Sequence, residues 1–139
     1  MKNHVTSLEL SKELKAKGFP QESLFYWNKW SHHTEPWLLT KSEQAFYKKE
    51  GAKDPEWVLS APIATEIGLP IVISQNGEDH NLNIYRPSQF LKGVDLSLGY
   101  QVGYENGVFS HDNIDIQSAP TLQEAMAKMW LYLKDNGLI

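Results

Sequence analysis

The sequence contains no cysteine. This absence excludes disulfide bonds, thiolate metal sites and cysteine nucleophiles, and it is compatible with a reducing compartment. The first fifteen residues contain no continuous apolar run, so they lack the pattern of a secretory signal. No stretch approaches the roughly 18–20 apolar residues that a membrane-spanning helix needs. The sequence therefore predicts a soluble, cytoplasmic protein with no membrane partner.

Basic charge is scarce in the middle of the chain. Residues 58–118 contain only Arg86 and Lys92 against seven acidic residues, and the whole chain has a formal net charge of −4. Residues 24–57, which hold four of the five tryptophans, are neutral, with five lysines against five acids. Because proteins that bind nucleic acids usually carry a basic stripe, the sequence disfavours nucleic acid as a partner.

Motifs that carry catalysis or bind phosphate are also missing. There is no G-x-S-x-G elbow, and the glycines at 99, 103 and 107 alternate within a strand pattern instead of leading into a helix. The carboxylates available for acid–base work lie in turn-like segments, where such residues usually serve the backbone. They are Glu78, Asp79, Asp112 and Asp115. No catalytic residue and no cofactor is predicted.

What is present is the composition of a globular protein rich in aromatic residues. Hydrophobic residues make up 41% of the 139 positions and charged residues 22%, which is ordinary for one domain spanning residues 1–139. Five tryptophans and six tyrosines are many for this length. They indicate a core or an interface built from large, flat side chains whose polar tips need partners.

Helix signals are clearest at the two ends. A capping box at Thr6–Glu9 and a stop at Gly18 predict a helix over about residues 7–17. A second capping box at Thr121–Glu124 and a stop at Asn136-Gly137 predict a closing helix with an apolar stripe, which can form a partner groove but more often docks on its own domain. The stripe consists of Leu122, Met126, Met129, Trp130 and Leu133.

The segments between these helices alternate like antiparallel strands. Residues 96–105 alternate apolar and polar side chains, and Asn106-Gly107 predicts a hairpin with Val108-Phe109 on the return strand. Residues 71–74 and 82–85 predict another hairpin around Asn76-Gly77-Glu78-Asp79. Short helices are expected from Ser60-Ala61-Pro62 to Gly68 and over Lys41–Lys49. The predicted fold is one compact α+β domain, an antiparallel sheet with helices packed on one face.

The segment from residue 23 to 39 concentrates rings and histidines. Residues 24–27 and 37–39 predict a buried hairpin whose exposed loop contains His32, His33 and Glu35. These are ligand-type residues, but neighbouring side chains on a strand point to opposite faces, so His32 and His33 are not expected to chelate one ion. No metal site is predicted.

Four segments, taken together, form a recurring pattern. They are SLFYW after GFP, then WVLSAPIATEIGLP, then a strand ending in GYQVGYENG, then APTLQEAMAKMWLYLKDNGLI. In this order they resemble a family of small uncharacterised proteins of bacteria, their prophages and phages, over Leu8 to Ile139. The resemblance implies a shared fold, a cytoplasmic product and a prophage context, and it implies no activity, cofactor or catalytic residue.

The leading functional hypothesis is a non-enzymatic accessory protein that acts through a protein partner or by self-association. The surplus of aromatic residues beside the missing catalytic motifs favours it, since Trp and Tyr are enriched at interfaces. Trp30, Trp37 and Trp57 border polar loops and are the expected contact residues. The alternative for all three is a place in the core.

Two other hypotheses remain open. A small-molecule-binding module would have its pocket between the Ser60–Leu69 helix and the Leu96–Tyr104 strand, where Gly99 and Gly103 leave room for a flat ligand. A small enzyme would use a histidine and an acid from residues 78–80 or 111–115.

Overall fold

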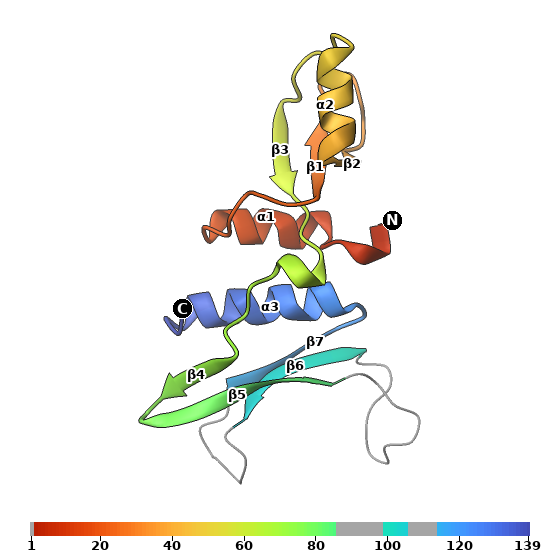
Figure 1. The fold of residues 1–139 in the computed structure, drawn as a ribbon. Coiled ribbons are helices and arrows are strands. Elements are labelled where there is room, and N and C mark those ends of the chain that lie inside the picture. The colour runs from red at the N-terminus through yellow and green to blue at the C-terminus, as the bar shows by residue number, and fades with distance from the viewer. Residues whose placement is uncertain (1, 86–98, 106–113) are drawn as a thin grey trace. The chain divides into compact units, whose positions relative to one another are not determined.

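The computed structural model describes residues 2–85, 99–105 and 114–139. The chain divides into two compact units, Met1–Glu66 and Ile67–Ile139, each with its own antiparallel sheet (Figure 1). The predicted α+β class with antiparallel strands is confirmed, although the strands form two sheets instead of one. Alternating side chains identify strands but not their partners, so the sequence did not reveal the division. The single domain stays a prediction.

The first unit contains a three-stranded sheet in the order β2-β1-β3. The expected hairpin of residues 24–39 is confirmed, with β1 at the centre, but Leu24 and Trp37 are exposed instead of buried. The helix α2 has the predicted bounds. α1 contacts β3, and α2 contacts β2. The elements are η1 (Lys2–His4), α1 (Leu8–Ala16), β1 (Phe25–Lys29), β2 (Trp37–Thr40), α2 (Lys41–Lys49), β3 (Trp57–Ser60) and η2 (Ala64–Glu66).

The core of the first unit is built around Trp27. In the register of the sheet, Trp27 lies opposite Leu38 on one side and Leu59 on the other. Trp27 and Leu59 are buried in one cluster with Val5 and Ala61. The indole Nε1 of Trp27 donates to the carbonyl oxygen of Thr6 at 3.2 Å, so the polar tip of this buried ring has a partner.

The start of α1 differs from the predicted capping box. Ser7 is the N-cap, and its hydroxyl accepts from the backbone N–H of Leu10 at 3.3 Å. The hydroxyl of Thr6 is buried and pairs with that of Ser11 at 2.8 Å. Thr6 and Ser7 are both good caps, and burial of Thr6 leaves Ser7 to cap.

The capping box of the first unit instead opens α2. The Thr40 hydroxyl accepts from the Glu43 N–H at 3.1 Å, and the Glu43 carboxylate accepts from the Thr40 N–H at 3.2 Å. The T-x-x-E pattern is visible in the sequence.

The prediction of a helix after Ser60-Ala61-Pro62 is wrong. Only the three-residue 3₁₀ helix η2 forms there. The Glu66 carboxylate accepts from the Ile63 N–H at 3.0 Å and also from Ser23 and Leu24. Because Glu66 links this turn to the start of β1, and Gly68 and Pro70 follow, the chain does not continue as an α-helix.

The second unit contains a four-stranded sheet in the order β4-β5-β6-β7. Its strands are β4 (Val72–Gln75), β5 (Glu78–Tyr85), β6 (Tyr100–Glu105) and β7 (Ile114–Ala119). The helix α3 (Leu122–Asp135) packs across β6 and β7 (Figure 1). The expected hairpin of β4 and β5 is confirmed, but β5 begins at Glu78 instead of residue 82. The turn is a tight Asn76-Gly77 pair in which both residues have positive φ, as a type I′ turn requires.

The structure confirms most of what the sequence predicts for β6 and α3. Val102 and Tyr104 are buried on the expected face of β6, whereas residues 96–98 and the Asn106-Gly107 turn with Val108-Phe109 lie outside the described residues. Most of the α3 stripe is buried, and only Leu122 is half-buried. The second capping box does not form, because Thr121 makes no side-chain capping hydrogen bond.

The ionisation of Tyr104 provides a test of the second unit. Burial raises the pKa of Tyr104 from 10.0 to about 12, and its hydroxyl donates to the carbonyl oxygen of Pro70 at 2.7 Å. A group with a raised folded-state pKa contributes stability below its unfolded pKa and loses it as pH rises through the folded value. We expect the unit to lose stability between pH 10 and about 12.

Ultraviolet absorbance titration checks this expectation. Tyr104 should ionise well above pH 10, and Tyr104→Phe should remove that step. Simultaneous ionisation of all six tyrosines near pH 10 would contradict the described burial.

Among the described residues, no helix combines the length and apolar character that a bilayer crossing requires.

Candidate aromatic binding site

The turn between β1 and β2 is held in a defined conformation by a buried tryptophan and a lysine. Trp30 follows β1 directly, is 9% exposed, and donates from its indole Nε1 to the Lys53 carbonyl oxygen at 2.8 Å. The Lys29 ammonium donates to the carbonyl oxygens of Trp30 and His33. The His33 N–H donates to the Trp30 carbonyl oxygen at 3.1 Å, which closes the turn.

Four rings lie together at this end of the hairpin. Trp30 and Trp37 meet edge to face with their centroids 5.8 Å apart. The His33 ring lies 4.2 Å from that of Trp37 and 4.3 Å from that of His32. Trp37 is 40% exposed, so the cluster has a buried member and a member that reaches solvent. Such edge-to-face and offset pairs hold aromatic side chains in fixed relative positions.

The prediction that His32 and His33 point apart is wrong. They lie in a turn, where the alternation of a strand does not apply, and their rings are neighbours. Within residues 2–85, 99–105 and 114–139, no group of three or more His, Cys, Asp or Glu side chains is placed to hold a metal ion.

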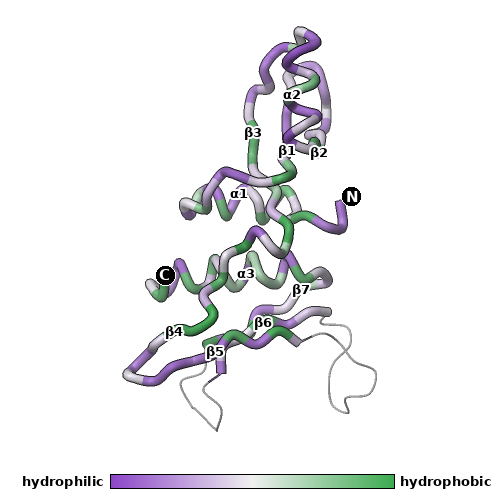
Figure 2. The backbone as a smooth tube through the Cα atoms, viewed as in Figure 1, coloured by the Kyte–Doolittle hydropathy of each residue, from purple (hydrophilic) through white to green (hydrophobic). Residues whose placement is uncertain are grey.

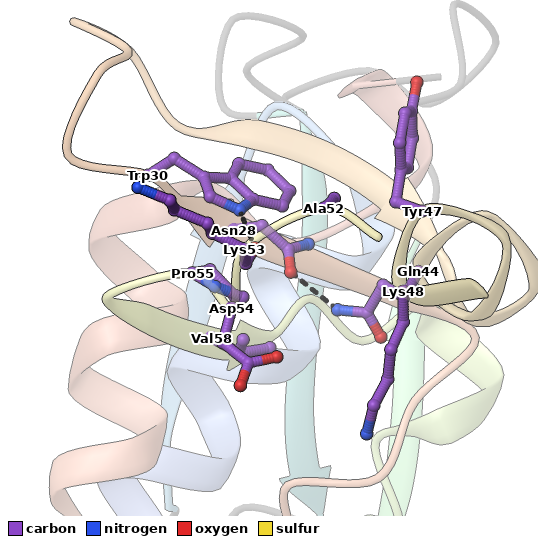
Figure 3. A pocket seen from close by; sticks show the side chains of 10 residues that line it. All are labelled: Asn28, Trp30, Gln44, Tyr47, Lys48, Ala52, Lys53, Asp54, Pro55 and Val58. Carbon is purple, nitrogen blue, oxygen red and sulfur yellow. Dashed lines mark hydrogen bonds between the residues drawn. The ribbon is translucent and has the colours of Figure 1, made fainter. Parts of the chain in front are cut away.

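Two hollows flank Trp30 on the first unit. We call one the aromatic hollow; it has a volume of about 250 Å³ and is lined by Trp30, His32, His33, Trp37, Tyr47, Ala52 and Lys53. The other, the polar hollow, has a volume of about 210 Å³ and is lined by Asn28, Trp30, Gln44, Tyr47, Lys48, Ala52, Lys53, Asp54, Pro55 and Val58 (Figure 3). Because Trp30, Tyr47, Ala52 and Lys53 line both, the two hollows are adjacent.

The lining of the polar hollow includes a buried amide side chain, that of Asn28. Asn28 is 1% exposed, donates from Nδ2 to the Tyr26 carbonyl oxygen at 3.0 Å, and accepts at Oδ1 from Gln44 Nε2 at 2.7 Å (Figure 3). These bonds connect the centre of the sheet to α2. The Asn28 side chain is therefore satisfied by the protein itself, and it positions Gln44 at the wall of the hollow.

The helix α2 supplies the outer wall and is itself little covered. Hydrophilic residues predominate along it, in contrast to β3, and it has no buried residue (Figure 2). Phe46 is 58% exposed and Tyr47 37%, and their rings meet edge to face at 5.7 Å. Two neighbouring exposed aromatic rings on an uncovered helix extend the apolar surface beyond the aromatic hollow.

The lining of the aromatic hollow contains hydrogen-bond donors and no carboxylate. Its charged residue is Lys53, and each of its two histidine rings has an N–H donor. The Trp37 indole N–H and the Tyr47 hydroxyl make no hydrogen bond to a described residue. The Trp30 indole N–H, in contrast, donates to the Lys53 carbonyl oxygen. The hollow therefore offers apolar faces edged by donors and positive charge.

The three tryptophans expected to make contacts lie in two places. Trp30 and Trp37 line the aromatic hollow, but Trp57 lines neither hollow. Trp57 is half-buried against the core cluster of the first unit, and the Lys12 ammonium lies 5.8 Å from the centroid of its ring. This arrangement gives Trp57 a role in packing, which was the alternative for that residue.

Tyr47 and Lys53 are site residues that sequence reasoning missed. Tyr47 lies on the predicted helix Lys41–Lys49. The neighbouring aromatic residues Phe46 and Tyr47 in an otherwise hydrophilic helix were the sequence signal that could have identified it. Lys53 lies in an irregular segment after Gly51 and is positioned by its own backbone carbonyl. No sequence pattern reports that kind of contact.

The residues of the two other hypotheses are described only in part. His80 is fully buried in β5, with Nδ1 3.2 Å from the Glu78 carbonyl oxygen, while His111 and Asp112 lie outside the described residues. The space above Gly103 is not open, because a Cβ there would lie 3.1 Å from the Ile116 side chain. The expected pocket joining residues 60–69 to 96–104 draws on both units and stays a prediction.

Comparisons of this chain with protein-family models, with curated proteins and with solved structures found no match.

Proposed function

We propose that this chain is a non-enzymatic accessory protein that binds a protein partner through the aromatic hollow of its first unit. The observation that carries the proposal is the ring cluster of Trp30 and Trp37, one ring fixed and buried and the other 40% exposed beside an uncovered helix. Contact energy in protein interfaces concentrates in Trp, Tyr and Arg, particularly where the ring sits in a preformed site.

Preorganisation supports the proposal. The turn that presents these rings is tied by the Lys29 ammonium, the Trp30 indole N–H and the His33 N–H. Ordering an interface side chain costs about 0.5–1.5 kcal/mol, and rings that are already fixed avoid much of this cost. A partner would therefore meet a surface that needs little rearrangement.

A pull-down from the native host with matched variants tests the proposal. Trp37→Ala is expected to reduce capture of the partner at least tenfold, the loss typical of an interface hot spot. Leu24→Ala is the control, because Leu24 is 56% exposed and apolar but precedes β1 at the end opposite Trp30. Equal capture by the wild type and Trp37→Ala would contradict the proposal.

Light scattering distinguishes a foreign partner from a second copy of the chain. Self-association through the aromatic hollow should give a dimer that Trp37→Ala converts to a monomer. A wild-type monomer that also captures no protein would contradict both forms of the proposal.

A second candidate function is a small-molecule-binding module, which the volume of the aromatic hollow favours. Ligand pockets usually measure about 300–1,000 Å³, so a hollow of about 250 Å³ suits a single ring better than a cofactor. A thermal-shift screen with a broad metabolite set separates the two candidates, because this module requires a hit.

The resemblance to small proteins of bacteria and prophages supports a cytoplasmic, mobile-element context for the same proposal. An accessory protein of this kind acts on the proteins of its host cell or of its own element. Neither nucleic acid nor membrane is part of the proposed contact.

A further inference from the structure

The aromatic hollow also indicates the chemistry of its partner. Resting on the proposed function, we propose that the hollow binds an apolar or aromatic side chain that is flanked by acidic residues in a peptide segment of the partner. Three properties of the lining carry this inference: its volume, its ring faces and its charge.

The volume sets the size of the anchoring group. An engineered apolar cavity of about 150 Å³ binds benzene. At about 250 Å³, the aromatic hollow can hold one aromatic or branched apolar side chain with part of its backbone. Its walls are the faces and edges of Trp30, Trp37 and Tyr47, which favour offset or edge-to-face contact with such a ring.

The charge sets the flanking residues. The lining includes Lys53, His32 and His33 but no Asp or Glu. The Trp37 indole N–H and the Tyr47 hydroxyl, which make no hydrogen bond to a described residue, can both donate one to a ligand. Charge-assisted hydrogen bonds from such donors to a carboxylate are stronger than neutral ones, so an acidic segment complements this edge.

A cationic ligand is disfavoured by the same residues. Aromatic cages that bind ammonium groups depend on the negative faces of their rings. Here Lys53 lines the hollow, and the Lys29 ammonium lies beneath the turn on the carbonyl oxygens of Trp30 and His33. A cationic ligand would be repelled by both lysines. The polar hollow differs because its lining includes Asp54.

Titration of the full chain with three blocked peptides tests the inference. The probes are acetyl-Gly-Asp-Phe-Glu-Gly-amide, acetyl-Gly-Lys-Phe-Lys-Gly-amide and acetyl-Gly-Asp-Ala-Glu-Gly-amide, followed by the indole N–H signal of Trp37, which Trp37→Phe assigns. The acidic peptide with Phe should bind at least tenfold more tightly than either of the others. Binding of the basic peptide with equal or higher affinity, or no binding by any peptide, would overturn the inference.

Two lysine variants provide the matched control. Lys53→Gln should weaken binding of the acidic Phe peptide at least threefold, and Lys49→Gln, an exposed lysine of α2 that lines neither hollow, should leave it unchanged. Equal effects of the two variants would show general attraction and overturn the site assignment.

If the Trp37→Ala variant loses its protein partner while the peptides bind alike, the proposed function stands and this inference fails. If the acidic peptide binds selectively but Trp37→Ala keeps its partner, the hollow has the inferred ligand preference and the proposed function fails.

Discussion

Replacement of Trp27 by alanine is expected to lower the free energy of unfolding of the first unit by about 3–5 kcal/mol, the usual cost of removing a buried Trp or Phe side chain. Trp27 is 7% exposed, lies opposite Leu38 and Leu59 in the sheet, and donates to the Thr6 carbonyl oxygen. The alanine variant loses these contacts and leaves a cavity beside β1, the central strand of the first unit's sheet. Urea unfolding of the full chain, with hydrogen exchange of the β1 amides, measures the loss.

Two variants define what the Trp27 result means. Trp27→Phe keeps a ring in the core but removes the indole hydrogen bond, and it should cost about 1–2 kcal/mol. Trp37→Ala removes a tryptophan that is 40% exposed and should cost less than Trp27→Ala. If Trp27→Ala and Trp37→Ala destabilise the unit equally, the assignment of one ring to the core and the other to the surface is contradicted.

Replacement of Glu66 by alanine is expected to cost about 2–4 kcal/mol, since hydrogen bonds to charged groups contribute about 1.5–3 kcal/mol each and are not additive. Its carboxylate accepts from the Ser23 hydroxyl at 2.8 Å, the Leu24 N–H at 2.7 Å and the Ile63 N–H at 3.0 Å. Thermal unfolding measures the effect.

The control for this glutamate is Glu56→Ala. Glu56 is exposed, and its side chain makes no hydrogen bond or ion pair with a described residue, so the change should stay within about 0.5 kcal/mol. A loss at Glu66 no larger than that at Glu56 would contradict the role of Glu66 in joining the turn at residue 63 to the start of β1.

Local signals predicted the elements better than they predicted their ends. The hairpin of β1 and β2, the helix over Lys41–Lys49 and the Asn76-Gly77 turn follow from side-chain pattern and turn chemistry, which act over a few residues. The cap at Ser7 and the 3₁₀ turn before Glu66 depend on contacts between distant residues, such as the 43-residue separation of Ser23 and Glu66. A sequence pattern does not report such contacts.

The candidate site was predictable only in part, because some of its residues come together through contacts between distant segments. Trp30 and Trp37 were expected to make contacts because aromatic residues bordered a polar loop, and both line the aromatic hollow. Trp57 met the same criterion, but it is partly buried against the core cluster that contains Val5 and Leu59. Lys53 and Tyr47 come from other segments, and only the folded first unit brings them to Trp30.

Photo-crosslinking from inside the aromatic hollow identifies the segment that the hollow binds. Benzoylphenylalanine in place of Tyr47, which lines the hollow, is irradiated in the native host, and the same group at Leu24 serves as the control. The account predicts a crosslink from position 47 to one protein, at an apolar residue flanked by Asp or Glu, and none from position 24. A crosslink to a basic segment, or equal products from both positions, would contradict it.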